Sequence, residues 1–587
     1  MNDKYVNSRS NAAPSIVSGK KRTRFDVGAT RRFTCNTGDF VPFYCQEVLP
    51  NDTWDMESAS LTRLETSLHQ TMDNAYLELA FFYVPNRIVM DDWDKLLGAN
   101  DDAWARNVEI STPQLKLYGP SASPTSSVTV SPQSLLNYLM LPSMTTPTYT
   151  EWLALDADAQ ADFEVTLLPL RATFQIYNDW FRDESVDSVV YFSKNNNDFQ
   201  LGYTFLFNGQ NFNPANATLK VNRFRDRFSS ALPAPQKGNP VSFGVGGYAP
   251  LVVGPTMNPL GGVAMYDAIN SNNDSHVLPT SGHYLELVGT YQGQSDKAGI
   301  GVRSYQNVTN NDVYNINKTN LVADLSKATA ITVNDLRLAI AAQVLSEQDA
   351  RGGTRLNEVL FSQWNLKVPS LMIDRSEYLG GKRIPLQMLE VLQTSETGTT
   401  VLGSDAGHSK TFDANSGSVL KSFMFHGYII GVAFIRTARS YSQGIDRQFY
   451  RKGKFTYYNP IFDNIGEVPV KKVELFANAS VAGEVFGYQE AWYEYKEGLN
   501  RDSGYMQTGI NGTLDTWHYG DKYVDTETGR PLLSPSWMKE DADRVDRTIA
   551  VSHDAAYQWT CFINVEAYAT RFMNKYSVPN SFGFGSK

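Results

Sequence analysis

Basic and aromatic side chains alternate in one short stretch of this sequence, and residues of these types bind ligands more often than they catalyse reactions. Residues 221–240 begin with Arg223, Arg225 and Arg227 at every second position, flanked by phenylalanines. Residues at this spacing share one face of an extended chain, so three guanidinium groups are expected side by side. Guanidinium groups bind phosphate, and aromatic rings stack on nucleic-acid bases. Arg223 and Arg225 are therefore candidates to contact nucleic acid.

A second stretch, Lys421–Pro460, combines a strand with a basic and aromatic segment. Its first half, Phe423–Ile435, is rich in β-branched and aromatic residues, which predicts a central strand buried on both faces. Its second half is polar and holds Arg436, Arg439, Arg447, Arg451, Lys452 and Lys454 among Tyr441, Phe449, Tyr450, Phe455, Tyr457 and Tyr458. Interfaces favour aromatic residues and arginine. This half therefore predicts a subunit contact or a nucleic-acid contact, the alternative being a solvated loop.

The N-terminal 32 residues form a basic segment on an acidic chain. They hold eight Lys and Arg against two Asp, a net charge of +6, whereas the whole chain carries −10. A cationic arm rich in Ser and Asn, without predicted structure, is typical of a tail that binds a polyanion. The alternative is a disordered tail without a partner. The candidates in this arm to face nucleic acid are Lys20, Lys21, Arg22, Arg24, Arg31 and Arg32.

Catalytic motifs are absent from the sequence. There is no P-loop, HExxH, GxSxG or Cys/His cluster, and the seven histidines are scattered. The nearest match to a dinucleotide-binding loop, residues 244–249, is followed at once by Pro250, with no strand, helix or acidic partner in register. The cysteines Cys35, Cys45 and Cys561 form no CxxC, so we expect small apolar core residues in a reducing compartment. We therefore predict no enzyme activity, no cofactor and no metal site.

Composition bounds the class of protein further. The charged fraction of 19% lies below the roughly 25% that is usual for soluble domains, so part of the surface is expected to be covered by a partner. No run approaches the roughly 18 apolar residues of a membrane span, and the N-terminus has no apolar signal-peptide core. We therefore expect neither a membrane helix nor a secretion signal.

Strand-like segments are scattered over the whole chain. They are Arg32–Val48, Asn74–Val84, Arg383–Gln393, Phe423–Ile435, Tyr488–Tyr495, Thr548–Ser552 and Tyr557–Phe572. Pro42 places a bulge in the first segment or puts it on a sheet edge. About eight strands separated by long excursions predict a mainly β fold, an eight-stranded antiparallel jelly roll with long helical and loop insertions.

Helical periodicity marks several of these excursions. The predicted helices are Ile88–Leu97, Ser131–Met140, Leu170–Asp183, Val333–Gln348 and Thr354–Trp364. The last two meet at the turn Arg351-Gly352-Gly353, where glycine is expected to supply backbone conformations that a β-carbon would forbid.

An insertion, residues 241–320, separates the two halves of the predicted fold. It is rich in Gly and Asn, is poor in charge and keeps apolar residues throughout, which predicts a loop-rich β module. Tyrosines in such a module offer rigid contact area. The candidates for contact with a host surface are Tyr248, Tyr266, Tyr284, Tyr291 and Tyr305. The predicted organisation is thus a basic arm (1–32), first strands with helical insertions (33–240), the insertion (241–320), and a helical pair with the remaining strands (321–587).

Nine motifs occur in one order along the chain. They are FVPFYCQEVLPNDTW (Phe40–Trp54), MDNAYLELAFFYVPNRIV (Met72–Val89), LPLRATFQIYNDWFRD (Leu168–Asp183), LPAPQKG (Leu232–Gly238), EQDARGGTR (Glu347–Arg355), RSEYLGG (Arg375–Gly381), HGYIIG (His426–Gly431), FGYQEAWYEYK (Phe486–Lys496) and DRTIAV (Asp546–Val551). Together they give the sequence a specific resemblance to the major capsid protein of microviruses, the small icosahedral single-stranded DNA phages, and to their gokushovirus branch. The sequence departs from that family at residues 210–219 and 241–320.

The resemblance implies a jelly roll of viral-capsid type, sixty copies of which close a T = 1 shell around circular single-stranded DNA. It also implies that the insertion projects at the threefold axes. The composition of the insertion predicts that it contacts a bacterial surface receptor, the alternative being a clamp at the threefold axis needed only for particle stability. Implied partners are other copies of the chain, packaged DNA, a small basic DNA-binding protein and an internal scaffolding protein. The implied location is the virion, assembled in the bacterial cytoplasm. The alternative class is a carbohydrate-binding or carbohydrate-active jelly roll, which needs a paired-carboxylate cleft or a calcium cluster.

Overall fold

The chain forms two compact units in the computed structural model, which are described separately here. One unit comprises Met1–Lys237 and Glu347–Lys587, and the other is Gly238–Ser346, within which the predicted insertion lies. The structure describes residues 22–573 and 575, except 70, 99–109, 140, 240–250, 254–263, 268–274, 278–283, 289–300, 306–312, 320, 324–332, 387–390, 393–404, 408–410, 414–418 and 464.

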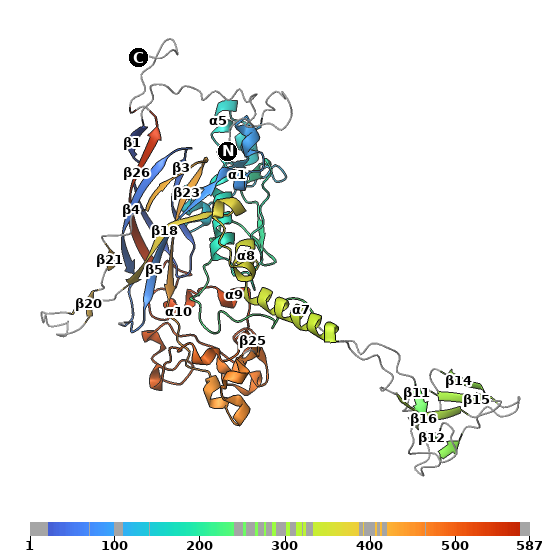
Figure 1. The fold of residues 1–587 in the computed structure, drawn as a ribbon. Coiled ribbons are helices and arrows are strands. Elements are labelled where there is room, and N and C mark those ends of the chain that lie inside the picture. Colours follow the sequence, from blue (N-terminus) through green and yellow to red (C-terminus); the bar gives the residue numbers. More distant parts are fainter. Residues whose placement is uncertain are drawn as a thin grey trace, which may run out of the picture. The chain divides into compact units, whose positions relative to one another are not determined.

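A six-stranded antiparallel sheet forms one layer of the first unit (Figure 1). Its longest strand, β26, pairs on one side with both N-terminal strands and on the other side with β4. β4 in turn pairs with two short strands. The strands are β1 (Arg22–Asp26), β2 (Ala29–Cys35), β4 (Thr53–Leu64), β21 (Thr411–Asp413), β22 (Val419–Ser422) and β26 (Trp559–Phe572).

A four-stranded antiparallel sheet forms the second layer, in the order β18-β5-β23-β3. Its strands are β3 (Val41–Val48), β5 (Ala75–Pro85), β18 (Glu377–Leu386) and β23 (Gly427–Thr437). The predictions that Phe423–Ile435 and Asn74–Val84 are buried strands are confirmed, because β5 and β23 lie at the centre of this sheet and are buried along almost their whole length.

The central strands are buried on both faces because the four-stranded sheet lies between two apolar layers. Ile429 and Ile435 of β23 point into a core shared with Trp54 and Trp559 of the six-stranded sheet. The intervening Val432 belongs to a second core, which also contains side chains of helix α6 (Leu168–Ile176). Strands of the six-stranded sheet have one buried face only, so their side chains alternate between buried and exposed positions.

The predicted strand Arg32–Val48 is split in the structure. Its first part belongs to β2 and its second part to β3, and these strands lie in different sheets. β3 is an edge strand, and its register against β23 shifts between Gly431 and Val432, opposite Pro42. The expectation of a bulged or edge strand at this proline is thus confirmed, and the expectation of one continuous strand is wrong.

Helical insertions cover the outer face of the four-stranded sheet (Figure 1). The predicted helix Leu170–Asp183 is confirmed, since α6 continues as a π-helical turn, Tyr177–Phe181. The predicted helix Ile88–Leu97 is instead two short helices. Further elements here are α1 (Asn86–Val89), α2 (Trp93–Leu96), α3 (Leu135–Tyr138), α4 (Tyr149–Leu153), α5 (Ala157–Ala161), β6 (Gln114–Lys116), β7 (Glu164–Thr166), β8 (Phe199–Gln200), β9 (Phe205–Phe207) and β10 (Gln210–Phe212).

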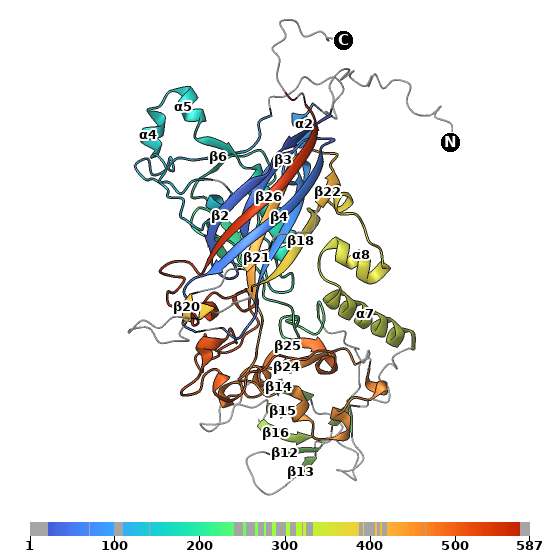
Figure 2. The same ribbon diagram turned by 90° about the vertical axis from the view of Figure 1, so that its left-hand side faces the viewer.

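A long excursion between β23 and β26 forms an irregular lobe, whose small core includes Tyr441 of the excursion and Phe228 of an earlier segment. Figure 2 shows this lobe in orange and red below the sheets. Its elements are β24 (Glu467–Lys471), β25 (Val485–Glu490), α9 (Pro535–Met538), α10 (Asp543–Asp546) and several 3-10 turns. The short strand expected at Thr548–Ser552 is wrong, because Ile549 forms only an isolated bridge to Ser67.

The second unit contains β-structure, as expected for the insertion. Five strands pair in the order β13-β12-β16-β15-β14, and β11 pairs with β17. They are β11 (Leu251–Val253), β12 (Ala264–Asp267), β13 (Ser275–Val277), β14 (Tyr284–Val288), β15 (Gly301–Tyr305), β16 (Val313–Thr319) and β17 (Leu321–Ala323). Because Leu251 pairs with Ala323, the two ends of this module are adjacent.

Two helices meet at the predicted glycine turn: α7 (Val333–Arg351) and α8 (Leu356–Trp364). Gly353 has the left-handed φ of +88° that favours glycine. Gly352 has a different role, because a β-carbon there would lie 2.4 Å from the Ser362 hydroxyl oxygen. Among the described residues, no helix combines the length and the apolar character needed to cross a membrane.

Substitution Gly352→Val tests this close approach of the turn to α8. We expect a loss of about 1–3 kcal/mol in the free energy of unfolding, because Ser362 and the α8 backbone must shift. Thermal and urea unfolding measure the change. The matched control is Gly498→Ala, where a β-carbon meets nothing within 4 Å. Equal stability of both variants would contradict the packing described here.

Candidate nucleic-acid interface

The outer face of the six-stranded sheet carries exposed arginines beside exposed aromatic rings. In β1 every second residue is exposed, including Arg22 and Arg24. Arg32 of β2 is also exposed, and β2 pairs with β26 as β1 does. Alternation along β26 exposes Tyr568 and Phe572, at 36% and 47% of their surface. This face is therefore built from the two ends of the chain.

Three arginine–aromatic pairs cross this face. The guanidinium carbon of Arg24 lies 3.9 Å from the centre of the Tyr568 ring. Arg22 and Phe572 are cross-strand partners, and the guanidinium carbon of Arg22 lies 5.7 Å from the centre of the Phe572 ring. Arg32 and Phe562 are also cross-strand partners, 5.5 Å apart. Such pairs are held by the attraction of a cation to an aromatic face, and they present planar groups on which bases can stack.

Acidic residues balance the arginines of this face. Arg24 forms an ion pair of 3.5 Å with Asp55, and both side chains are about half exposed. Glu57 and Glu566 are also exposed on neighbouring strands. Because the charges on the sheet itself are mixed, this face offers bases a stacking surface and has little net attraction for phosphate.

The structure corrects the expectation of a structureless arm over residues 1–32. Residues 22–26 and 29–35 are strands that pair with β26. Lys20 and Lys21 lie outside the described residues. Arg31 alternates to the opposite side of β2 from Arg32 and is partly buried. The arm that could extend from the sheet is therefore at most residues 1–21.

Arg223 is placed inside the protein, which corrects its prediction as a nucleic-acid contact. Its side chain is only 5% exposed and lies 3.2 Å from the carboxylate of Asp521. Its guanidinium group also stacks on Trp537 at 3.8 Å. The segment around it forms an isolated bridge at Asn222 and turns, not a strand.

The three alternating arginines each pair with different acids. Arg227 is buried with Glu474, whereas Arg225 keeps 63% of its side chain exposed while it pairs with Asp183 at 3.0 Å. The expectation of three guanidinium groups on one open face is wrong, because buried carboxylates bind two of them. Arg225 stays a candidate.

Arg223 belongs to a cluster of buried, charged side chains in the first unit. Arg439 bridges Asp521 and Glu540, at 2.7 Å and 3.0 Å, and Arg544 contacts both acids. Burial raises the pKa of Asp521, but the surrounding guanidinium groups outweigh it and hold the pKa well below its usual value. The cluster is therefore ionised, and removing one member would leave a buried charge unpaired.

The tyrosines proposed for host contact lie in the second unit. Tyr266, Tyr284 and Tyr305 are in β12, β14 and β15, and Tyr284 is the register partner of Tyr305. Tyr248 and Tyr291 lie outside the described residues. Their role in recognition stays a prediction.

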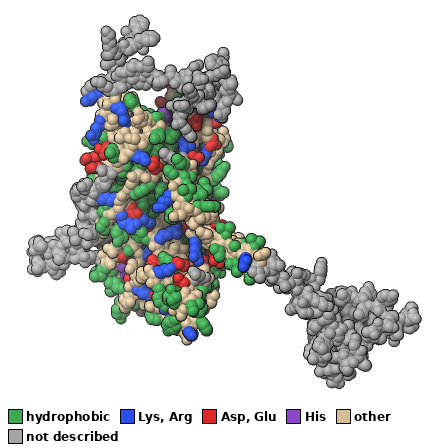
Figure 3. Space-filling model, in the orientation of Figure 1, with side chains coloured by type: hydrophobic (Ala, Val, Ile, Leu, Met, Phe, Trp, Pro, Cys, Tyr) green, Lys and Arg blue, Asp and Glu red, His purple; other side chains and the backbone are tan. Residues whose placement is uncertain are grey.

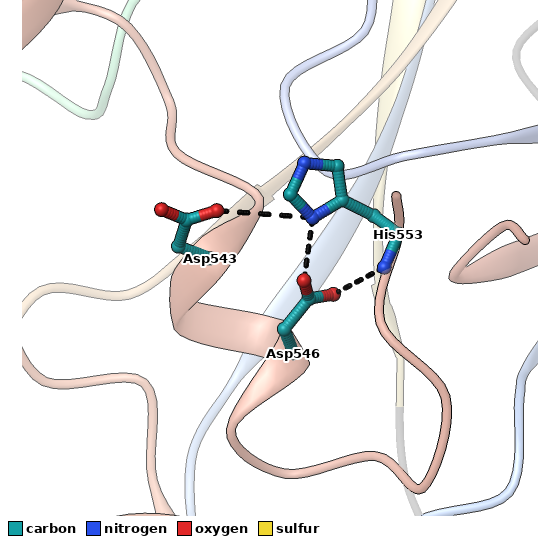
Figure 4. Close-up of side chains that lie close together, drawn as sticks. All are labelled: Asp543, Asp546 and His553. Atoms are coloured by element: carbon teal, nitrogen blue, oxygen red, sulfur yellow. Dashed lines mark hydrogen bonds and ion pairs between the residues drawn. The ribbon is translucent and has the colours of Figure 1, made fainter. Parts of the chain in front are cut away.

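Figure 4 shows a cluster of Asp543, Asp546 and His553 that sequence reasoning did not find. Their ligand atoms lie within 4.8 Å of one another, close enough to share a metal ion. The side chains also satisfy each other, since Nδ1 of His553 contacts the Asp546 carboxylate and lies 3.7 Å from that of Asp543. The cluster ties α10 to the segment that leads into β26. The only sequence signal was four Asp residues close to one His.

The aromatic half of the candidate interface was also missed. Phe562, Tyr568 and Phe572 fall in the predicted strand Tyr557–Phe572, whose alternation marks them as sharing one face. Which strand lies beside them could not be read from the sequence, because β1 is more than 500 residues away.

Comparisons with known proteins agree over nearly the whole chain. The profile of the family described as "Capsid protein (F protein)" matches residues 15–581. Capsid protein VP1 of Spiroplasma virus 4 is 32% identical over 566 residues, which cover 93% of this chain and 92% of the relative. Capsid protein VP1 of Bdellovibrio phage phiMH2K is 30% identical and covers 96% of both chains. Capsid protein VP1 of Chlamydia phage 1 is 27% identical over 95% of both.

The His553 cluster predicts a pH-dependent contribution to stability. Burial alone would lower the pKa of His553, but Asp546, Asp554 and Asp543 raise it above its ordinary value of 6.5. The contribution is therefore complete below about pH 6.5 and is lost as pH rises through the higher pKa of the folded state. We expect roughly 0.5 kcal/mol for this partly exposed pair. Melting temperatures of the native protein and His553→Gln, measured from pH 5.5 to 8.5, check this.

The difference in melting temperature between the native protein and His553→Gln should shrink towards pH 8.5. A difference that grows with pH would contradict the assignment.

Proposed function

Because this chain belongs to the family of microvirus major capsid proteins, we propose that sixty copies assemble into a T = 1 icosahedral shell around circular single-stranded DNA. The observation that carries this proposal is the match to capsid proteins over more than nine-tenths of the chain. The location of the protein is the virion. Assembly in the bacterial cytoplasm, with an internal scaffolding protein and a small basic DNA-binding protein, is part of the proposal.

The strand order supports a jelly roll of viral-capsid type. Eight strands in chain order are β2, β3, β4, β5, β18, β22, β23 and β26. Numbered one to eight, they fall into sheets of order 1-8-3-6 and 2-7-4-5. This is the order of two antiparallel sheets wound as a jelly roll, with the helical layer and the lower lobe as insertions between strands.

Exposed apolar side chains support assembly with other copies. In the described part of the first unit, Trp364, Met372 and Ile461 are 74%, 77% and 85% exposed. Assembly with other copies would remove such apolar surface from water. A carbohydrate-binding or carbohydrate-active role has no comparable support.

The outer face of the six-stranded sheet is proposed to face the packaged DNA. Its Arg–aromatic pairs offer stacking that is indifferent to sequence, and the basic residues of 1–21 supply attraction for phosphate. Lys20, Lys21, Arg22, Arg24 and Arg32 remain the candidates on this side.

The test is expression of the full chain, followed by electron microscopy and measurement of nuclease-protected DNA. We expect small spherical particles that contain single-stranded DNA. A variant without residues 1–21 keeps β1 in place, so it should still form particles but contain less DNA. If about six cations contact phosphate, the log–log salt slope of single-strand binding by the unassembled chain is about −4. The deletion should reduce its magnitude.

Two results would contradict these proposals. Small oligomers in place of particles would overturn the shell. Unchanged DNA content and salt slope in the deletion variant would overturn the role of the arm. The variant Lys367→Gln, which removes one exposed cation that lies outside the six-stranded sheet and outside the segment 447–461, controls for a general loss of positive charge.

We further propose that the second unit recognises the host surface. It is a separate unit whose first and last strands, β11 and β17, pair with each other, so the β-structure between them can project from the shell without interrupting the sheets. Its tyrosines, including the register partners Tyr284 and Tyr305, supply rigid contact area. The alternative is a clamp between copies at a threefold axis.

Replacing Leu251–Ala323 with a short Gly/Ser linker separates these alternatives. These residues are register partners in an antiparallel pair, roughly 5 Å apart, so a short linker can close the gap without strain. We expect intact particles that adsorb to host cells at least ten-fold less. Loss of particles would favour the clamp, and intact particles that still adsorb would contradict recognition. A variant with the same linker inserted after Gly498 controls for the linker itself.

A further inference from the structure

A pocket of about 350 Å³ lies in the irregular lobe between β23 and β26, called the lower lobe below. It lies on the basic and aromatic segment for which the sequence predicts an interface. Its walls come from the 3-10 turns Arg447–Tyr450 and Lys454–Thr456, from β24, and from the chain after β25. Its volume falls in the range of about 300–1,000 Å³ that is typical of small-ligand sites. The pocket is separate from the outer face of the six-stranded sheet.

Aromatic and guanidinium groups line this pocket together. Tyr450, Phe455 and Trp492 contribute rings, and Arg447 and Arg451 contribute planar cations. Trp492 is fixed in place, since its indole nitrogen donates to the Phe462 carbonyl oxygen at 2.9 Å. It also has a left-handed φ of +67°, a costly conformation for a residue other than glycine.

The basic side chains that line the pocket outnumber the acidic side chains that line it. Arg451 lies 3.1 Å from the Glu494 carboxylate and Arg447 lies 3.9 Å from the same oxygen. One buried carboxylate therefore serves two guanidinium groups. Lys471 also lines the pocket beside Glu474, and Glu474 is shared with the buried Arg227. An incoming anion would be stabilised by this excess of cations.

The rim of the pocket is exposed and also carries basic and aromatic side chains. Residues 452–461 are all exposed. Among them, Phe455 and Tyr457 are 77% and 54% exposed and lie next to the cations Lys452 and Lys454. Figure 3 shows hydrophobic, basic and acidic side chains together over the lower part of the first unit. A chain of net charge −10 thus concentrates cations and rings at one site.

We infer that this pocket binds one nucleotide of single-stranded nucleic acid, with the base against the aromatic walls and a phosphate near Arg447. The inference rests on the proposed enclosure of single-stranded DNA and assigns a second contact to it, distinct from the sheet. Stacking on aromatic side chains does not depend on base identity, so the site accepts any base. Contact with a second copy of the chain is the competing use of this surface.

The test uses the full-length, unassembled chain and a fluorescein-labelled 12-mer of thymidylate. Phe455→Ala should weaken binding about 5- to 10-fold, because one base loses its stacking partner. The matched control is Phe449→Ala. Phe449 is 69% exposed, against 77% for Phe455, and its ring does not line the pocket. This variant should change the affinity less than two-fold. Arg447→Gln should reduce the magnitude of the log–log salt slope by about 0.7.

A second measurement locates the contact directly. A 12-mer containing 5-iodouracil is photocrosslinked to the native chain, and the modified peptides are identified by mass spectrometry. Crosslinks to Tyr450, Phe455 or Trp492 support the pocket, and their loss in Phe455→Ala supports it further.

Three results would overturn the inference. If Phe455→Ala binds like the native chain and crosslinks fall on the six-stranded sheet alone, the pocket is wrong while the proposed enclosure of DNA stands. If Phe455→Ala abolishes particles with unchanged oligonucleotide binding, the surface is a contact between copies. If the native chain binds no oligonucleotide at all, the proposed DNA contact fails and the pocket fails with it.

Discussion

Burial of the four-stranded sheet on both faces is the constraint on which the rest of this structure depends. β5 and β23 carry apolar side chains at almost every position, so neither face of their sheet can be left in water. The six-stranded sheet covers one face, and α6 with its neighbouring insertions covers the other. The long excursion that separates β5 from β18 therefore includes part of the core.

The same constraint leaves one sheet face free for binding. The six-stranded sheet needs to bury only its inner side, and alternation along β26 and β4 puts polar and aromatic side chains on its outer side. The proposed contact with packaged DNA uses this open face, whose rings and guanidinium groups are presented without interrupting the core. The pocket in the lower lobe has the same chemistry in a concave form.

Buried ion pairs explain why alternating arginines misled the sequence reading. A period of two places Arg223, Arg225 and Arg227 on one face of an extended segment, but the segment turns and bridges instead of extending. Asp521 and Glu474, more than 200 residues away, bind two of the three guanidinium groups. A buried arginine needs such partners, since its charge cannot be left unpaired away from water.

The sequence by itself determined the class of fold, the central strands, the bulge at Pro42 and the family, because each is written in local composition, in periodicity or in motifs. It also placed residues 447–458 of the basic and aromatic segment at the surface, but it was wrong for Arg439 and Tyr441 of the same segment, which are buried. Tertiary structure alone decided that residues 22–26 and 29–35 are strands, that Arg223 is buried, and that Arg22 lies on Phe572. The physical reason is that periodicity determines which side chains share a face of one strand. Pairing between distant strands, and between distant charges, then determines what that face meets.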